Sequence, residues 1–177
     1  MSYKKIKMKR ILFIGFILIS VNLSGQDIME SNTNAVKSID GIVKEILNII
    51  SGEKGKIRNW DAFRNLFLPT AQFTVLYHTD EFPLPYETVT LEDFITLMHD
   101  QYYDDGFLEY EISKKVDKYN GLAQVFQTYY AKDSENQEER GITSYQLIYF
   151  DKRWWIVNIV WTGDSNGVEV PEKYLGN

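Results

Sequence analysis

The hydrophobic pattern of the chain changes its period at Gly106. Ahead of Gly106, apolar residues recur every three or four positions, which is typical of one face of an α-helix. After it, apolar and polar residues alternate, which is typical of half-buried strands. The pairs Asn120-Gly121 and Asp151-Lys152 lie between strand-like runs and predict tight turns. The order of elements is therefore helical first and then an antiparallel meander of four strands, which indicates an α+β fold.

Three helices and one strand are predicted ahead of Gly106. The helices are expected over Ala35–Ile50, Trp60–Phe67 and Leu91–Tyr103, and the strand over Ala71–Tyr77. Asn59 is expected to cap the second helix and Pro69 to stop it. Thr90 and Asp93 have the spacing of an acidic capping box at the start of the third helix. The stretch 79–86 contains two prolines and is expected to be a loop.

The N-terminus has the pattern of a secretory signal peptide. Met1–Arg10 holds five basic residues and no acid, Ile11–Ile19 is apolar apart from Gly15, and small polar residues follow. The alternative is a membrane anchor, but nine helical residues rise only about 14 Å, against about 30 Å of bilayer core. We expect cleavage near Gly25/Gln26 and export to the periplasm or beyond the cell. Residues 1–25 would be the signal, 26–34 a flexible leader and 35–177 one domain.

Composition excludes several function classes. The 177 residues are 44% hydrophobic and 25% charged, which is a globular composition. The chain has no cysteine, which excludes disulfides, thiol chemistry and cysteine-bound metals. Cleavage would remove five positive charges and no acid, which changes the net charge from −6 to −11. An acidic chain of this kind is expected to bind neither nucleic acid nor, once cleaved, an anionic membrane.

Five stretches carry a resemblance to the nuclear transport factor 2-like superfamily, over about residues 35–175. They are Trp60-x-x-Phe63-x-x-Leu66-Phe67, Gly106-Phe107-Leu108-Glu109, 121–126 with Tyr129, 140–147, and 153–157 with Trp161. The chain resembles an exported bacterial branch of this group, which also contains ketosteroid isomerase, scytalone dehydratase and small polyketide cyclases. The resemblance implies a cone-shaped roll, in which three N-terminal helices pack on a strongly bent antiparallel sheet. No catalytic motif of those enzymes matches residue by residue, so the resemblance assigns no catalytic residue.

A pocket is expected between the helices and the bent sheet. The aromatic and histidine candidates for its wall are Trp60, Phe63, Phe67, Tyr77, His78, Phe94, Tyr129, Tyr145 and Trp161. The only histidines are His78 and His99, and two isolated histidines do not have the spacing of a metal site. We therefore expect no metal and no cofactor.

The acidic residues of the strands allow two interpretations. Glu109 and Glu111 lie two positions apart, about 7 Å along one strand face, which is a separation that acid/base enzymes use. The interpretation favoured by the alternation is that they form the solvated face of the strand, or that Glu109 pairs with Arg140. The acids of 134–139 are expected to lie in a solvated loop.

Three functions are consistent with these features. The first is an exported protein that binds a small apolar molecule in the cone without catalysis. The second is a cofactor-free lyase or isomerase that uses a pocket histidine or carboxylate. The third is a homodimeric interaction module, in which an outward tryptophan of the pair Trp154-Trp155 lies beside Val157 or Ile159 on an apolar outer sheet face.

Overall fold

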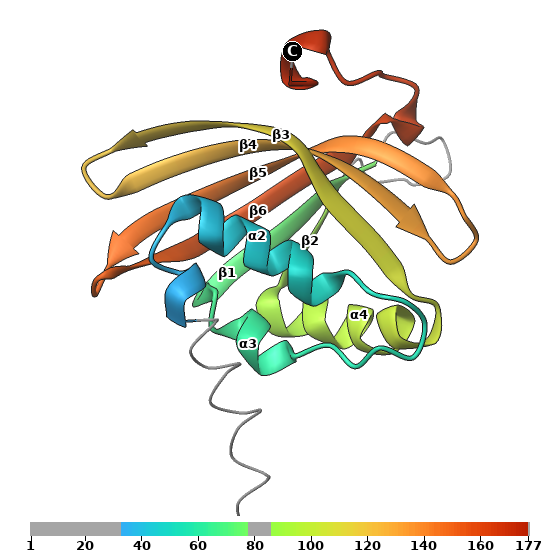
Figure 1. Cartoon of the computed structure of the whole chain (residues 1–177), viewed down its shortest axis with the longest axis horizontal. Helices are drawn as coiled ribbons and strands as arrows, with labels where there is room; N and C mark the ends of the chain where they lie inside the picture. Colours follow the sequence, from blue (N-terminus) through green and yellow to red (C-terminus); the bar gives the residue numbers. More distant parts are fainter. Residues whose placement is uncertain (1–32, 78–85, 177) are drawn as a thin grey trace, which may run out of the picture.

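A strongly bent sheet arches over the helices in the computed structural model, which describes residues 33–77 and 86–176 (Figure 1). The expected signal peptide, nearly all of the leader and most of the 79–86 loop lie outside these residues. Within the described ranges, no helix is long and apolar enough to cross a membrane.

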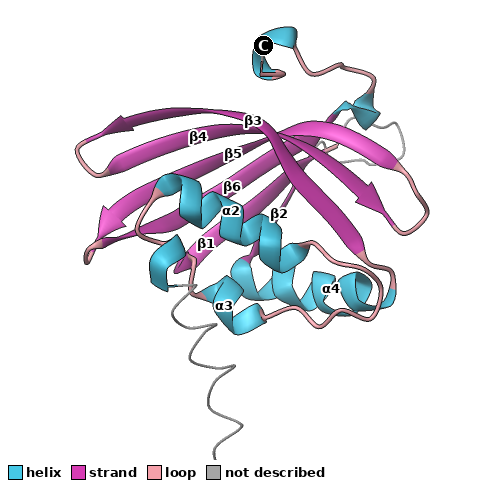
Figure 2. Ribbon diagram, viewed as in Figure 1, coloured by secondary structure: helices cyan, strands magenta, loops and turns pink. Residues whose placement is uncertain are grey.

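One six-stranded sheet carries the fold, with the strand order β2-β1-β6-β5-β4-β3. The α-helices are α2 (Ile39–Ile50), α3 (Trp60–Arg64) and α4 (Leu91–Asp104), and two short 3-10 helices, η1 (Asp164–Asn166) and η2 (Glu172–Tyr174), follow the last strand. The strands are β1 (Phe67–Leu76), β2 (Tyr86–Thr90), β3 (Phe107–Tyr119), β4 (Leu122–Asp133), β5 (Glu138–Phe150) and β6 (Arg153–Gly163). All neighbours pair antiparallel except β1 and β6, which pair parallel. The helices α2, α3 and α4 lie on one side of the sheet (Figure 2), and the predicted α+β roll is confirmed.

The predicted turns and caps form as the local sequence indicates. Asn120 and Gly121 have φ values of 45° and 83°, and Asp151 and Lys152 have 49° and 62°. These left-handed pairs are typical of two-residue hairpins, because their twist matches that of the strands they join. The side chain of Asn59 accepts a hydrogen bond from the Ala62 N–H and so caps α3.

The structure differs from the prediction around Pro69 and at β2. α3 ends at Arg64, and Pro69 lies inside β1 instead of stopping a helix. The pairing of β1 with β6 is irregular between Phe67 and Gln72, which accommodates a residue without an N–H. β2 was not predicted, because its five residues form a short edge strand that is mostly exposed and has little hydrophobic periodicity.

A cluster of stacked aromatic rings joins α3 and α4 to β1. The ring centres of Phe63 and Phe67 lie 4.8 Å apart, and those of Phe73 and Phe94 lie 4.5 Å apart. Phe63 also stacks on Phe94 across the two helices, at 5.8 Å. Trp60 packs edge-on against Phe63 from behind, at 5.5 Å. These contacts fix both helices on the concave side of the sheet.

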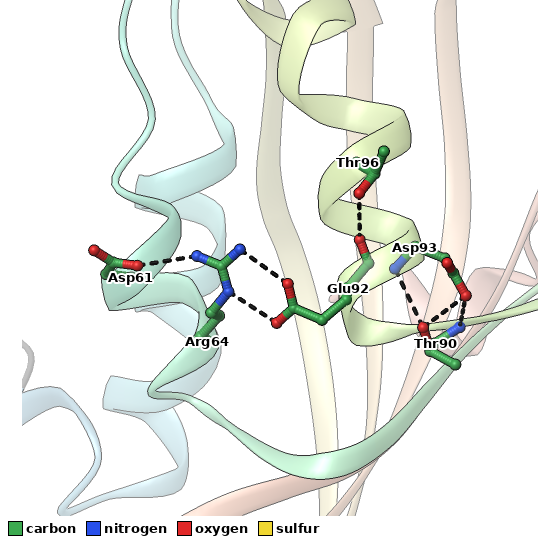
Figure 3. A network of polar contacts seen from close by, with 6 residues as sticks. All are labelled: Asp61, Arg64, Thr90, Glu92, Asp93 and Thr96. Carbon is green, nitrogen blue, oxygen red and sulfur yellow. Dashed lines mark hydrogen bonds and ion pairs between the residues drawn. The ribbon is translucent and has the colours of Figure 1, made fainter.

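Polar contacts at the start of α4 support this packing (Figure 3). The Thr90 hydroxyl accepts a hydrogen bond from the Asp93 N–H at 3.2 Å, and the Asp93 carboxylate accepts one from the Thr90 N–H at 3.4 Å. This is the predicted capping box. Arg64 on α3 donates two hydrogen bonds to Glu92 on α4, at 2.8 and 2.9 Å, so the two helices are also joined by an exposed ion pair.

Arg58 holds together the connection between α2 and α3. Its side chain is buried and donates to four backbone oxygens, at 2.6–3.4 Å. The acceptors are the carbonyls of Ile50, Gly52, Glu53 and Lys56. The last turn of a helix has carbonyls without a helical partner. The guanidinium donates to one of these and also to carbonyls of the loop that follows α2. The positive charge also lies favourably at the C-terminal end of α2.

Replacing Arg58 should therefore destabilise the protein far more than replacing Arg64. Arg58→Met leaves several buried carbonyls without a donor, and we expect the free energy of unfolding to fall by about 3 kcal/mol. Arg64→Met removes an exposed ion pair and should cost less than about 1 kcal/mol. Urea unfolding of both variants measures the difference. Equal losses in the two variants would contradict the role given to Arg58.

Candidate functional site

A cavity of about 340 Å³ lies between the helices and the concave face of the sheet. All three helices and all six strands contribute to its wall. Its aromatic wall consists of nine side chains: Phe63, Phe73, Tyr77, Phe94, Tyr102, Phe107, Tyr129, Tyr145 and Trp161. The lining residues Glu87, Leu97, Gln101 and Asp133 are exposed, so they mark the mouth of the cavity.

Six of the predicted pocket residues line this cavity. They are Phe63, Tyr77, Phe94, Tyr129, Tyr145 and Trp161. Trp60 and Phe67 lie outside its lining, because both pack behind Phe63 in the aromatic cluster. His78 lies outside the described residues. That these residues contact a ligand stays a prediction.

Glu109 faces the cavity, so the expectation that it belongs to a solvated strand face is wrong. Two apolar residues of β3 beside Glu109 point away from the helices instead: Leu108 is 46% exposed and Tyr110 is 49% exposed. Tyr110 stacks on Tyr130 of β4 on that outer face, at 4.8 Å. The Ser51 hydroxyl, at the end of α2, accepts from the Glu109 N–H at 2.9 Å and donates to the Glu109 carbonyl at 2.8 Å. These two bonds fix the strand in the register that turns the carboxylate inward.

Glu139 also faces the cavity, although it was predicted in a solvated loop. β5 begins at Glu138, and the Glu139 carboxylate accepts hydrogen bonds from the Tyr129 hydroxyl at 2.9 Å and the Ser165 hydroxyl at 2.6 Å. Two glycines make room for this pair. A Cβ atom on Gly163 would overlap the Glu139 carboxylate, and one on Gly141 would overlap the Tyr129 phenol.

The two acids of β3 have different partners. Glu111 accepts hydrogen bonds from Gln127 at 2.8 Å and from Lys114 at 2.7 Å, and Gln127 in turn accepts from the Tyr145 hydroxyl at 2.9 Å. Glu109 has no side-chain hydrogen bond or ion pair among the described residues, and the alternative pairing with Arg140 is not formed. Glu111 is therefore part of a satisfied structural network, whereas the carboxyl group of Glu109 is available to a ligand.

The surroundings of Glu109 disfavour its charged form. Burial, together with the negative charge of Glu139, raises the pKa of Glu109 from 4.5 to about 8. Burial and Glu139 also raise the pKa of the Tyr129 hydroxyl, which therefore remains protonated as a donor. A carboxyl group with a pKa near neutrality, beside apolar walls, can either give or take a proton under physiological conditions.

The described residues contain no group of three or more acidic or histidine side chains arranged to hold a metal ion. His99 lies on the exposed side of α4 and contacts Asp100 at 2.7 Å, away from the cavity. The outer face of the sheet differs from expectation as well. Ile159 points inward and is buried, because Val157 forms a bulge that shifts the alternation of β6.

No family model matches the chain, and no curated protein matches its sequence. Several solved structures match its fold. A conserved protein from Planctomyces limnophilus is 10% identical with a TM-score of 0.57, and the match covers 76% of this chain and 97% of that one. A nuclear transport factor 2-like protein from Cytophaga hutchinsonii is 13% identical with a TM-score of 0.52, over 78% and 97% of the two chains.

The chain has the nuclear transport factor 2-like fold. A candidate ketosteroid isomerase from Shewanella frigidimarina has it too, at 12% identity and a TM-score of 0.51, over 69% of this chain and 92% of that one. At these identities the likeness shows the fold alone, and the chemistry has to be argued from the site of this chain.

The inward position of Glu109 and Glu139 in this nuclear transport factor 2-like roll differs from what the sequence predicts. The signal that was present is Phe107, an apolar residue directly before Leu108. Phe107 stacks on Tyr102 of α4, at 4.8 Å, and thereby places the odd-numbered positions of early β3 inward. Two adjacent apolar residues fit either phase of a strand, so the pattern alone does not choose between them.

The raised pKa of Glu109 predicts a pH dependence of stability. Between about pH 4.5 and pH 8, the folded protein binds a proton at Glu109 more tightly than the unfolded chain does. The free energy of unfolding should therefore fall as the pH rises through this window, by about 1 kcal/mol per pH unit. Glu109→Gln removes the titration, so the variant should gain stability relative to wild type as the pH rises.

Denaturant unfolding across this pH range tests the prediction. Glu138→Gln is the matched control, because Glu138 is exposed at the start of the same strand that carries Glu139. The control should keep the pH profile of the wild type. Parallel profiles for wild type and Glu109→Gln would show that Glu109 titrates as an ordinary surface carboxyl.

Proposed function

We propose that the protein binds a small, largely apolar molecule in the cavity of the roll. The observation that carries this proposal is a 340 Å³ cavity with nine aromatic side chains in its wall and one unpartnered carboxyl group, Glu109, among them. Ligand sites are typically cavities of about this size, with mostly apolar walls and a few polar groups that orient the ligand. We further propose that the protein acts outside the cytoplasm as a homodimer, in line with the N-terminal pattern and the fold.

Ala131 offers a way to fill the cavity. It is buried on β4 and lines the cavity, so Ala131→Phe would place a ring in the space that we assign to the ligand. We expect this variant to bind a neutral apolar fluorophore, N-phenyl-1-naphthylamine, at least about 10-fold more weakly than wild type, a loss of about 1.4 kcal/mol. Fluorescence titration measures the affinity, and thermal unfolding verifies that the variant is folded.

Val160→Phe is the control for this experiment. Val160 lies on β6 with its side chain on the outer face, beside Ser144 of β5 and Thr74 of β1. This variant adds an aromatic ring to the same sheet but leaves the cavity unchanged, so it should bind the fluorophore as wild type does. Equal binding by wild type and Ala131→Phe would contradict the cavity as the site.

Glu109 favours a second candidate function, the transfer of a proton from a carbon atom of the ligand. A carboxylate in an apolar cavity with a raised pKa is a strong general base, and Tyr145 and Tyr129 lie in the same wall. The enzyme would be a lyase or isomerase without a cofactor. The ionised form of Glu109 is the base, so activity should rise with pH through about 8.

A generic carbon acid tests this second function. In 5-nitrobenzisoxazole, the carboxylate takes the proton from the ring carbon, the C–H electron pair completes a nitrile, and the N–O bond breaks to release a coloured phenolate. Glu109→Gln should lower the rate at high pH by about 100-fold. Glu138→Gln should leave it unchanged. The same rate in wild type and Glu109→Gln would exclude Glu109 as a base for this reaction.

A further inference from the structure

We propose that the ligand of this cavity is an organic cation, a hydrophobic amine or a quaternary ammonium compound. The inference rests on the proposed binding function and names the class of ligand. Its basis is the charge of the cavity wall, the aromatic faces around it and the unpartnered carboxyl group of Glu109.

The charged residues that the structure places in the wall are all acidic. Glu109 and Glu139 lie inside, and Glu87 and Asp133 lie at the mouth. Among the described residues, the lining contains no lysine, arginine or histidine. Several negative charges within low-dielectric walls raise the local concentration of positively charged ligands and repel anions.

Aromatic faces add a second attraction for a cation. The faces of tryptophan, tyrosine and phenylalanine attract ammonium groups, and sites for quaternary ammonium ligands are built from several such rings. Here Tyr102, Tyr129, Tyr145 and Trp161 line the same cavity as the two inner carboxylates. A neutral apolar ligand would use the rings alone, whereas a hydrophobic cation uses both the rings and the charges.

Glu111 has a cationic partner in the structure, whereas Glu109 has none among the described residues. Lys114 neutralises Glu111 at 2.7 Å and also contacts Asp40 on α2 at 3.2 Å. Glu109, two residues earlier on the same strand, has no cationic partner among the residues that the structure describes. The groups that interact electrostatically with it are acids or hydroxyls: Glu139 and Tyr145 from β5, Tyr129 from β4 and Tyr102 from α4.

A cation in the cavity would supply the missing charge and favour the ionised form of Glu109. Binding is then linked to the loss of the Glu109 proton, so affinity for a cation should increase as the pH rises from about 6 to about 9. A neutral ligand that accepts a hydrogen bond from protonated Glu109 would show the opposite trend. The direction of the pH dependence therefore separates the two ligand classes.

Two probes of equal shape test the inference. Phenyltrimethylammonium and tert-butylbenzene differ only in the charged nitrogen that replaces a carbon atom. Each is titrated against the full-length protein at about pH 9 by displacement of N-phenyl-1-naphthylamine. We expect the cation to bind at least about 10-fold more tightly, a preference that should disappear in Glu109→Gln and persist in Glu138→Gln.

The possible outcomes separate the ligand class from the binding function. If tert-butylbenzene binds as tightly as the cation, the inference is wrong and the proposed binding of apolar molecules stands. If the fluorophore binds but neither probe displaces it, the inference is wrong and the binding of apolar molecules stands. If the fluorophore itself does not bind, the proposed function is contradicted as well. A cation affinity that stays constant or falls between about pH 6 and pH 9 would also overturn the inference, and this measurement needs no variant.

Discussion

The concave face of a bent sheet has to be covered by other elements, and in this chain stacked aromatic rings determine where the covering helices lie. Phe63, Phe73 and Phe94 join α3 and α4 to β1, with ring centres 4.5–6.2 Å apart. Flat rings in contact leave little freedom for the helix that carries them, so α4 is held firmly at the β1 side of the sheet. α2 contacts β3 through Ser51 and Glu109, and the cavity of about 340 Å³ lies where the three helices meet the inner face of the sheet.

Polar residues can persist on the inner face because the cavity provides room around them. Closer packing of α4 on β3 and β5 would leave the carboxyl groups of Glu109 and Glu139 in a dry core, where an unpaired charge is very costly. Instead Gly141 and Gly163 widen the space around Tyr129 and Glu139. The neighbouring Gln127 and Glu111 show the other solution, because they belong to a hydrogen-bonded chain that continues to Lys114. The same sheet face therefore contains one satisfied polar network and one open polar group.

Local chemistry made most of the fold predictable from the sequence, and non-local contacts explain the rest. The turn at Asn120-Gly121 and the cap at Thr90 depend on neighbouring residues alone, and the structure has both. β2 depends on its pairing with β1, because five mostly exposed residues do not form a stable strand by themselves. The alternation on β3 correctly indicated a strand, but it did not show which residues face inward. That depends on the contact of Ser51 with Glu109, which are 58 residues apart in the sequence. The aromatic half of the site was therefore predictable, and its acidic half was not.

The stability of the fold does not require the acidic residues of the site. Aromatic side chains stabilise a roll whether or not it binds anything, because they bury large apolar surfaces. A carboxyl group in the position of Glu109 does the reverse, since burial and the charge of Glu139 both oppose its ionisation. Glutamine at this position would fill the same volume without that cost. A ligand with a positive charge, as proposed above, would convert this cost into binding free energy.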